Sequence, residues 1–235
     1  MVHRLKIIIP INNDSLNEIT AKELLPLESR DFELDIHNLT SGPNFIENRF
    51  SDYIAHPALI DAATAAEEEG YSGIFVDCFT DPAVDIMREM VDMPVVGAFL
   101  PAVLTASSLC QRYSIITVLP EVVPIYEQLS RESGIRGSVV SIRNIGTHVA
   151  DLGDSENLVE NLFTQCLAAV EEGAQGVVLG CTGMLGVTDF LRQRLLDNGF
   201  SIPVINPTKC GVAMLMALVR QGLTHSRITY PRHSP

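Results

Sequence analysis

Short apolar runs alternate along the chain with longer segments in which apolar positions recur about every 3.6 residues. The longer segments include HPALIDAATAAEEEG and SENLVENLFTQCLAAVEEG, and each ends in Gly, a frequent residue at helix C-termini. This alternation predicts an α/β fold of mostly parallel sheets flanked by helices. The runs of strand length are LKIIIPI (5–11), FELDIHNL (32–39), GIFVDC (73–78), PVVG (94–97), SIITVL (114–119), SVVSIR (138–143), GVVLGC (176–181) and PVIN (203–206).

The chain also contains an internal repeat. EEGYSGIFVDC (68–78) and EEGAQGVVLGC (171–181) share E-E-G-x-x-G, three apolar residues, one variable residue and Cys. The alternative explanation is that strand–helix units resemble each other by composition alone. The shared cysteine makes the match more specific, because cysteine is a rare residue. The match continues at similar offsets between MPVV (93–96) and IPVI (202–205), IHNL (36–39) and IRNI (142–145), and LKIII (5–9) and YSIIT (113–117).

We expect the repeat to fold as two lobes related by a pseudo-two-fold axis, with the active site in the cleft between them. The chain is long enough for two such units, each with a sheet of its own. The predicted division puts residues 1–100 and 205–235 in lobe one, with Cys78, and residues 101–204 in lobe two, with Cys181.

The cysteines fall into two groups by position. Cys78 and Cys181 occupy equivalent places in the repeat, where a predicted strand gives way to a loop and then a helix. The remaining cysteines, Cys110, Cys166 and Cys210, lie in predicted helices among apolar neighbours, where a free thiol usually behaves as a small hydrophobe. We therefore expect Cys78 and Cys181 in the crevice outside the carboxyl ends of the strands, where open α/β sheets bind ligands.

The residues after each of these two cysteines favour anion chemistry. F-T-D-P follows Cys78, which makes Asp81 a candidate N-cap and Pro82 a first helical residue. A helix N-terminus at this place would lower the pKa of the thiol. After Cys181, Thr182 and Gly183 offer backbone N–H groups for an oxyanion.

Two opposed thiols suit the transfer of a carbon-bound proton. Inversion at a carbon next to a carbonyl requires a base on one face and an acid on the other. A thiolate and a thiol supply both, so the reaction needs no metal and no organic cofactor.

Composition narrows the partners and the compartment. The 16 Lys and Arg residues against 29 Asp and Glu give a net charge of -13, which would repel nucleic acid and anionic membranes. The apolar run near the start is too short for a signal peptide, and no stretch reaches the roughly 20 apolar residues of a membrane span. We expect a cytoplasmic protein whose five cysteines are free thiols and whose six histidines lack metal-binding spacing.

Several motifs together resemble a known family. D-C-F-T-D-P (77–82) is similar to A-C-F-x-D-P of hydantoin racemases, and V-L-G-C-T-G-M (178–184) to their V-L-G-C-A-G-M. Over nearly its whole length the sequence resembles the aspartate/glutamate/hydantoin racemase superfamily, above all the hydantoin and allantoin racemases. Further similar segments are Y-S-I-I-T-V-L (113–119), S-G-P-N-F-I-E (41–47) and I-P-V-I-N-P (202–207).

The resemblance implies a cofactor-independent racemase or epimerase of a small cyclic ureide or amide, working as a homo-oligomer. Cys78 and Cys181 would be its acid/base pair. Two departures bear on the substrate: Pro10 and Asn13 replace an Asn and a Thr of the family's opening I-N-P-N-T, and Thr182 replaces an Ala. The substrate-binding residues that it implies are Asn12, Phe79, Thr117, Thr182 and Gly183.

Other functions remain open from the sequence. Within the superfamily they are a maleate-type cis-trans isomerase, an arylmalonate-type decarboxylase and an amino-acid racemase, and outside it a ligand-binding sensor without turnover. Arg49 and Lys209 could steady an anionic substrate group, although a solvated or helix-end role is the simpler interpretation of each.

Overall fold

The computed structural model describes residues 2–153 and 155–233 and contains two four-stranded parallel sheets. All eight predicted strand runs form strands, so the expected α/β class is confirmed. The first sheet has the order β2-β1-β3-β4 and the second the order β6-β5-β7-β8. The strands are β1 (His3–Ile9), β2 (Phe32–Asn38), β3 (Gly73–Val76), β4 (Val95–Val96), β5 (Tyr113–Thr117), β6 (Val139–Asn144), β7 (Val177–Leu179) and β8 (Val204–Ile205).

The two sheets are copies of one pattern, as the internal repeat predicts. Each sequence match found in the repeat pairs a strand of the first sheet with the strand at the same position in the second: β1 with β5, β2 with β6, β3 with β7 and β4 with β8. β1 and β5 are the inner strands that begin each repeat, and their apolar runs are buried. Near-continuous apolar runs are typical of parallel strands that are covered on both sides.

Helices cover both sheets. The longest, α2, begins with a capping box, in which the Asn48 side chain accepts from the Ser51 N–H and the Ser51 hydroxyl accepts from the Asn48 N–H. In the described part of the chain no helix is long and apolar enough to cross a membrane. The helices are α1 (Asn17–Leu24), α2 (Arg49–Glu68), α3 (Val84–Met90), α4 (Phe99–Leu109), α5 (Val123–Glu132), α6 (Ser155–Glu171), α7 (Thr188–Asp197) and α8 (Pro207–Arg220), with short 3-10 turns at Leu25–Leu27, Pro120–Val122 and Val149–Asp151.

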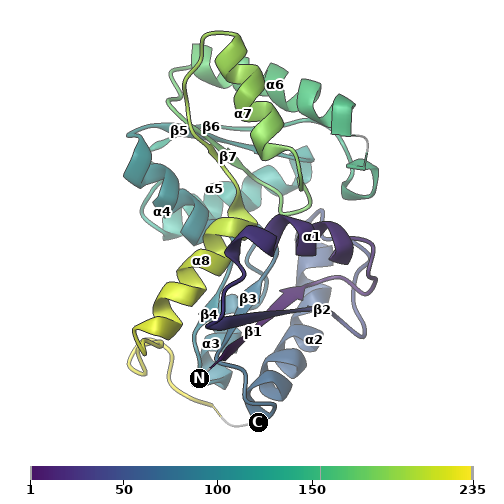
Figure 1. Cartoon of the computed structure of the whole chain (residues 1–235), viewed down its shortest axis with the longest axis vertical. Helices are drawn as coiled ribbons and strands as arrows, with labels where there is room; N and C mark the ends of the chain where they lie inside the picture. The colour runs from purple at the N-terminus through teal and green to yellow at the C-terminus, as the bar shows by residue number, and fades with distance from the viewer. Residues whose placement is uncertain (1, 154, 234–235) are drawn as a thin grey trace.

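Two helices cross between the lobes. α4 follows β4 of the first sheet but packs against β7 and β8 of the second, whereas α8 follows β8 but packs against β3 and β4. The two helices also pack against each other where the lobes meet (Figure 1). The predicted lobe limits at 100/101 and 204/205 lie next to these crossings, and the division itself stays a prediction.

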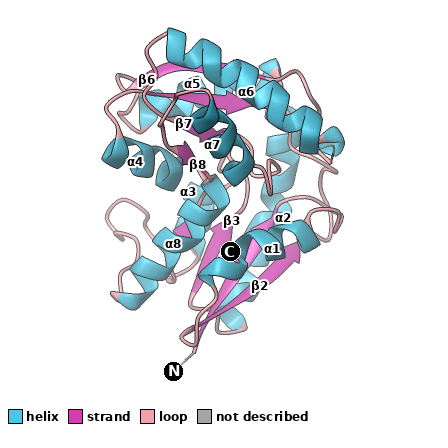
Figure 2. Ribbon diagram, turned by 45° about the horizontal axis from the view of Figure 1, so that its top comes forward, coloured by secondary structure: helices cyan, strands magenta, loops and turns pink. Residues whose placement is uncertain are grey.

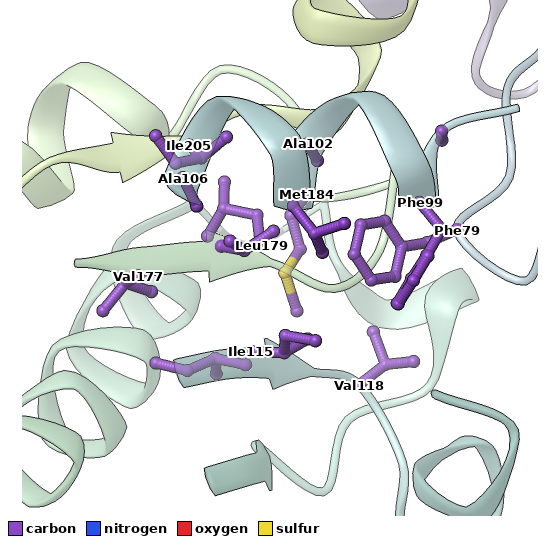
Figure 3. Packing of buried hydrophobic residues seen from close by; sticks show 14 of the residues in the cluster. Phe79, Phe99, Ala102, Ala106, Ile115, Val118, Val177, Leu179, Met184 and Ile205 are labelled. Carbon is purple, nitrogen blue, oxygen red and sulfur yellow. The ribbon is translucent and has the colours of Figure 1, made fainter. Parts of the chain in front are cut away.

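The main apolar core runs through this junction. Phe79 of the first lobe packs edge-on against Phe99 of α4 and Tyr126 of α5, with ring centroids 5.2 and 5.1 Å apart. Figure 3 shows Phe79 beside Phe99, with Ala102 and Ala106 of α4 over β7. The carboxyl ends of β2 and β3 point from the lower lobe toward the upper one (Figure 2).

Candidate active site

The structure brings the two predicted cysteines to one small cavity. Cys78 lies two residues beyond the end of β3, and Cys181 two residues beyond the end of β7. Both thiols are partly exposed and line a cavity of about 30 Å³. The equivalent strand ends of the two sheets therefore face the same space.

The turn that carries Cys181 is held by side chains of the second lobe. Thr117 Oγ1 and Tyr126 Oη each donate to the carbonyl oxygen of Gly180, at 2.9 Å and 2.9 Å. Gly180 has to be glycine, since a Cβ there would lie 2.7 Å from Cγ2 of Ile115. Thr182 Oγ1 donates to the carbonyl oxygen of Asp77 at 2.9 Å, which ties this turn to the first lobe.

The turn after Cys78 differs from the sequence prediction. α3 begins only at Val84, and its N-cap is Ala83 in the left-handed region (φ 55), so no helix starts at Pro82. Asp81 instead caps α4, because its Oδ1 accepts from the N–H groups of Ala98 and Phe99 at 2.6 and 2.9 Å. The predicted helix N-terminus beside the Cys78 thiol is therefore absent, and the carboxylate serves the helix that crosses to the other lobe.

The expected lowering of the thiol pKa is also not found. Burial raises the pKa of Cys78 far above its usual range and raises that of Cys181 to about 12. The backbone N–H groups of Gly183 and Met184 oppose this effect at Cys181, as the backbone N–H of Thr80 does at Cys78. Around each thiol, loss of water outweighs these hydrogen bonds.

Asp77 is a cavity residue that the sequence reasoning did not select. Its side chain is buried and lines the cavity with both thiols, and its Oδ1 accepts from Thr208 Oγ1 at 2.8 Å. Burial raises the pKa of Asp77 to about 7. The only signal in the sequence was its place directly before Cys78.

The rest of the cavity wall is mostly apolar. It comes from the end of β1, from the segment that precedes α2 and from the 3-10 turn after β6, and none of the described lining residues is Lys or Arg. Apolar walls with few polar groups are typical of small-molecule sites. The lining residues other than the thiols and Asp77 are Ile9, Pro10, Ile11, Leu16, Phe45, Ile46, Val149, Thr182 and Gly183.

The predicted substrate-binding residues divide into two groups. Thr182 and Gly183 line the cavity. Thr117 and Phe79 are buried in the core, where they support the turn of Cys181 and the junction of the lobes. Asn12 is exposed and donates to the carbonyl oxygen of Gly42 at 2.9 Å. A binding role for these three stays a prediction.

The two cationic residues considered for binding an anionic substrate group do not line the cavity. Arg49 donates to Gln128 Oε1 at 3.1 Å, and Lys209 pairs with Glu23 Oε1 at 2.7 Å. Within the described residues no three His, Cys, Asp or Glu side chains are grouped to hold a metal ion. Cys166 is buried inside α6, Cys210 lies within α8, and Cys110 caps the C-terminus of α4.

The protein is an α/β protein built from two similar parallel sheets. Each sheet carries a cysteine beyond the matching strand end, and the two cysteines line one cavity. Residues 14–215 match the family model described as Asp/Glu/Hydantoin racemase. The chain therefore belongs to the Asp/Glu/hydantoin racemase family, and it is an isomerase of the racemase type.

Individual relatives agree with this assignment. The chain is similar to a hydantoin racemase from Paenarthrobacter aurescens, with 32% identity over 95% of this chain and 94% of the relative. A hydantoin racemase from Pseudomonas sp. (strain NS671) is 34% identical over 80% of this chain and 74% of its own length. The crystal structure of an allantoin racemase from Pseudomonas fluorescens superposes with a TM-score of 0.90 at 27% identity, covering 99% of this chain and 97% of that one.

Proposed function

We propose that this protein is a cofactor-independent racemase or epimerase of a small cyclic ureide or amide of the hydantoin or allantoin type. In this proposal Cys78 and Cys181 transfer the proton. The observation that carries it is the shared cavity, which both cysteines line from equivalent strand ends of the two sheets. In this proposal the two thiols reach a bound ring from different sides. The named hydantoin and allantoin racemases among the relatives support the substrate class. Homo-oligomer formation and a cytoplasmic location stay predictions.

The reaction uses one thiolate and one thiol. The thiolate takes the proton from the ring carbon next to a carbonyl, the electron pair moves onto the carbonyl oxygen, and the other thiol protonates the opposite face of the carbon. Negative charge on Cys181 raises the pKa of Cys78 further, beyond the effect of burial, so the two thiols do not ionise together. Each turnover thus leaves the protonation states of the two cysteines exchanged.

The cavity wall favours a neutral ring over an anionic substrate. A carboxylate of an amino acid or dicarboxylate would need a positive partner, and none of the described lining residues provides one. Asp77 stands in the same wall, and a negative charge there would repel such a substrate. Thr182, which replaces the Ala of the hydantoin racemases, donates its hydroxyl hydrogen to the backbone carbonyl oxygen of Asp77. These contacts favour the ureide over the other members of the superfamily.

Single cysteine variants test the two-thiol mechanism. We expect Cys78→Ser and Cys181→Ser each to lower the rate of racemisation by about a hundredfold or more, because each loses the acid or base for one face. Each variant can still exchange the substrate hydrogen from its remaining side. The measurement is circular dichroism of an enantiopure 5-substituted hydantoin, together with deuterium incorporation from deuterated water.

Cys110→Ser is the matched control, since Cys110 lies at the C-terminal end of α4 away from the cavity lining, and its rate should stay near wild type. If either Cys78→Ser or Cys181→Ser interconverts the enantiomers at the wild-type rate, the two-thiol mechanism is wrong. A wild-type protein that binds the hydantoins without exchanging their hydrogen would be a sensor instead.

A further inference from the structure

Three hydrogen-bonded side chains lead from the Cys78 thiol to the surface of the molecule. Cys78 Sγ lies 3.3 Å from Thr80 Oγ1, and Thr80 Oγ1 donates to Asp52 Oδ2 at 2.5 Å. Asp52 Oδ1 lies 3.1 Å from Nε2 of His56, one turn further along α2. Every neighbour in the series is within hydrogen-bonding distance.

Exposure rises from Thr80 to His56. Thr80 is buried, the side chains of Asp52 and His56 are 18% and 23% exposed, and His56 borders a wide surface pocket of about 530 Å³. This pocket does not include either thiol among its lining residues. The series therefore connects the thiol with solvent at a place apart from the active-site cavity.

The hydroxyl of Thr80 fixes the direction of the hydrogen bonds. A threonine hydroxyl has one hydrogen, and when it donates that hydrogen to Asp52 its oxygen must accept from the S–H of Cys78. Cys78 is thus the protonated thiol in this arrangement, and its proton already points at the first member of the series.

The second cysteine has no equivalent series. The residue two positions after Cys181 is Gly183, which has no side chain, where Thr80 follows Cys78. Among the described residues, the groups that hydrogen-bond the Cys181 sulfur are the backbone N–H groups of Gly183 and Met184. The two halves of the repeat differ at this position although their strands match.

We propose that Thr80, Asp52 and His56 form a proton relay that resets Cys78 between turnovers. The inference rests on the two-thiol racemisation proposed above, in which each turnover exchanges the protonation states of the cysteines. A cavity of about 30 Å³ holds about two water molecules, which is little solvent for proton exchange at two thiols. A path through side chains removes that restriction.

The transfer conserves protons and charge. The S–H proton moves to Thr80 Oγ1 as the hydroxyl proton moves to Asp52 Oδ2, which leaves a Cys78 thiolate, an intact hydroxyl and a neutral Asp52. A half-turn of the Asp52 carboxylic acid group presents its proton to Nε2 of His56. Nε2 accepts this proton when His56 is the neutral tautomer with its hydrogen on Nδ1. His56 then releases the Nδ1 proton to water, and Asp52 has regained its negative charge. The reverse sequence reprotonates Cys78. Cys181 makes the opposite change by exchanging its proton with water in the cavity that both thiols line, so one thiol and one thiolate are restored.

A measurement without substrate tests the relay directly. The protein is mixed into deuterated water, and exchange of the Cys78 proton is followed by the S–H stretching band that Cys78→Ser lacks. We expect Thr80→Val to slow this exchange by about tenfold or more, because the isosteric side chain cannot pass a proton. Thr80→Ser should restore the rate, and the band of Cys181 should exchange as in wild type. Unchanged Cys78 exchange in Thr80→Val would overturn the relay.

Turnover provides the second readout. With an enantiopure 5-substituted hydantoin, Thr80→Val and His56→Gln should lower steady-state turnover at saturating substrate by about tenfold and leave the first turnover near wild type. Thr64→Val makes the same substitution on α2, where the hydroxyl donates to the Ile60 carbonyl, its partner among the described residues, and should change neither rate. His56→Gln alters a partly exposed side chain, so it keeps the test available if Thr80→Val does not fold.

Equal losses in the first and later turnovers would mean that Thr80 only positions the thiol, and would overturn the relay. A wild-type protein that fails to racemise hydantoins would disprove the proposed function. In that case the S–H exchange rates would still decide whether the side-chain path carries protons.

Discussion

Asp77 shows how strongly its surroundings change the chemistry of a single residue. Its carboxyl group is 3% exposed, accepts a hydrogen bond from Thr208 and borders the space between the two thiols. Burial disfavours the charged form more than the hydrogen bond favours it, which is why the pKa of Asp77 rises to about 7. Near neutral pH this residue can be present in either charge state.

The raised pKa of Asp77 predicts a pH-dependent stability. The folded protein binds this proton more tightly than the unfolded chain, whose carboxyl has the ordinary pKa of 3.8. The stabilising contribution of the neutral group is complete below about pH 4 and is lost as the pH rises toward 7. From pH 5 to pH 8 the free energy of unfolding should fall in wild type because of Asp77. In Asp77→Asn we expect this decrease to be smaller by on the order of 2 kcal/mol.

Urea unfolding at the two pH values measures the difference between the variant and wild type. Asp61→Asn, on the exposed side of α2, is the control and should follow the wild-type pH dependence. Parallel pH profiles for Asp77→Asn and wild type would show that Asp77 is already ionised in the folded protein.

Sequence reasoning selected the candidate site through its cysteines. Cys78 and Cys181 stood out because both end a repeated strand, and the structure places them in one cavity. Asp52 and His56 gave no such signal, since they lie far from Cys78 along the chain and become its neighbours only when α2 packs on the sheet. The prediction that Asp81 caps the helix directly after it was wrong. Most N-caps act on the helix that follows them in sequence, whereas Asp81 caps α4, which begins further along the chain.

Among the elements, α8 and β3 pack so closely that a glycine is needed between them. A Cβ on Gly211 of α8 would lie 2.0 Å from Cε2 of Phe75. Phe75 is fully buried in β3, so its ring has no room to move away. The absence of a side chain at Gly211 lets the helix lie directly on the strand that leads to Cys78.

We expect Gly211→Ala to destabilise the protein by about 1–3 kcal/mol, because overpacking in a buried contact outweighs the better helix propensity of alanine. Gly137→Ala is the control, since a Cβ at Gly137 meets nothing within 4 Å. Urea midpoints of the two variants and wild type give the comparison. A Gly211→Ala protein as stable as Gly137→Ala would mean that α8 shifts without cost.

The strands were predictable, and the helix exchange was not. The inner strands β3 and β7 are buried apolar runs bounded by polar or Gly-containing segments, and this pattern can be recognised without knowledge of the partner strand. The apolar faces of α4 and α8 show only that these helices pack against something. The connections after β4 and β8 determine which sheet each helix packs against. Hydrophobic periodicity does not predict these connections.

For the molecule as a whole, the two lobes are joined over the cavity. Glu47 of the first lobe accepts from the N–H of Val149 at 2.7 Å and pairs with Nδ1 of His148 at 3.0 Å, both in the second lobe. Phe45, Ile46 and Val149 line the cavity beside this Glu47 bridge. The proposed ring substrate is larger than two water molecules, so we expect the bridge to move when the substrate enters.

Removing the bridge should loosen the second lobe's side of the cavity. In Glu47→Ala we expect hydrogen–deuterium exchange of the segment 145–152 to speed up by about tenfold, since the Val149 amide loses a charged acceptor. The pairing with Glu47 raises the pKa of His148, so the ionic part of the bridge is present at low pH and is lost as the pH rises through that pKa.

Glu160→Ala removes an exposed ion pair with Arg194 in the same lobe, and exchange of 145–152 should stay as in wild type. If Glu47→Ala and Glu160→Ala exchange this segment at the same rate, the lobes are held closed by other contacts.

The crossing of α8 to the first sheet also affects how the protein is made. β3 and β4 leave the ribosome early, but the helix that covers them is synthesised only after the whole second sheet. At a translation rate of about 5–20 residues per second, the apolar surface of these strands stays exposed for several seconds before α8 is synthesised. During translation the nascent first sheet is therefore a binding target for chaperones, and the chain can complete neither half before its last helix emerges.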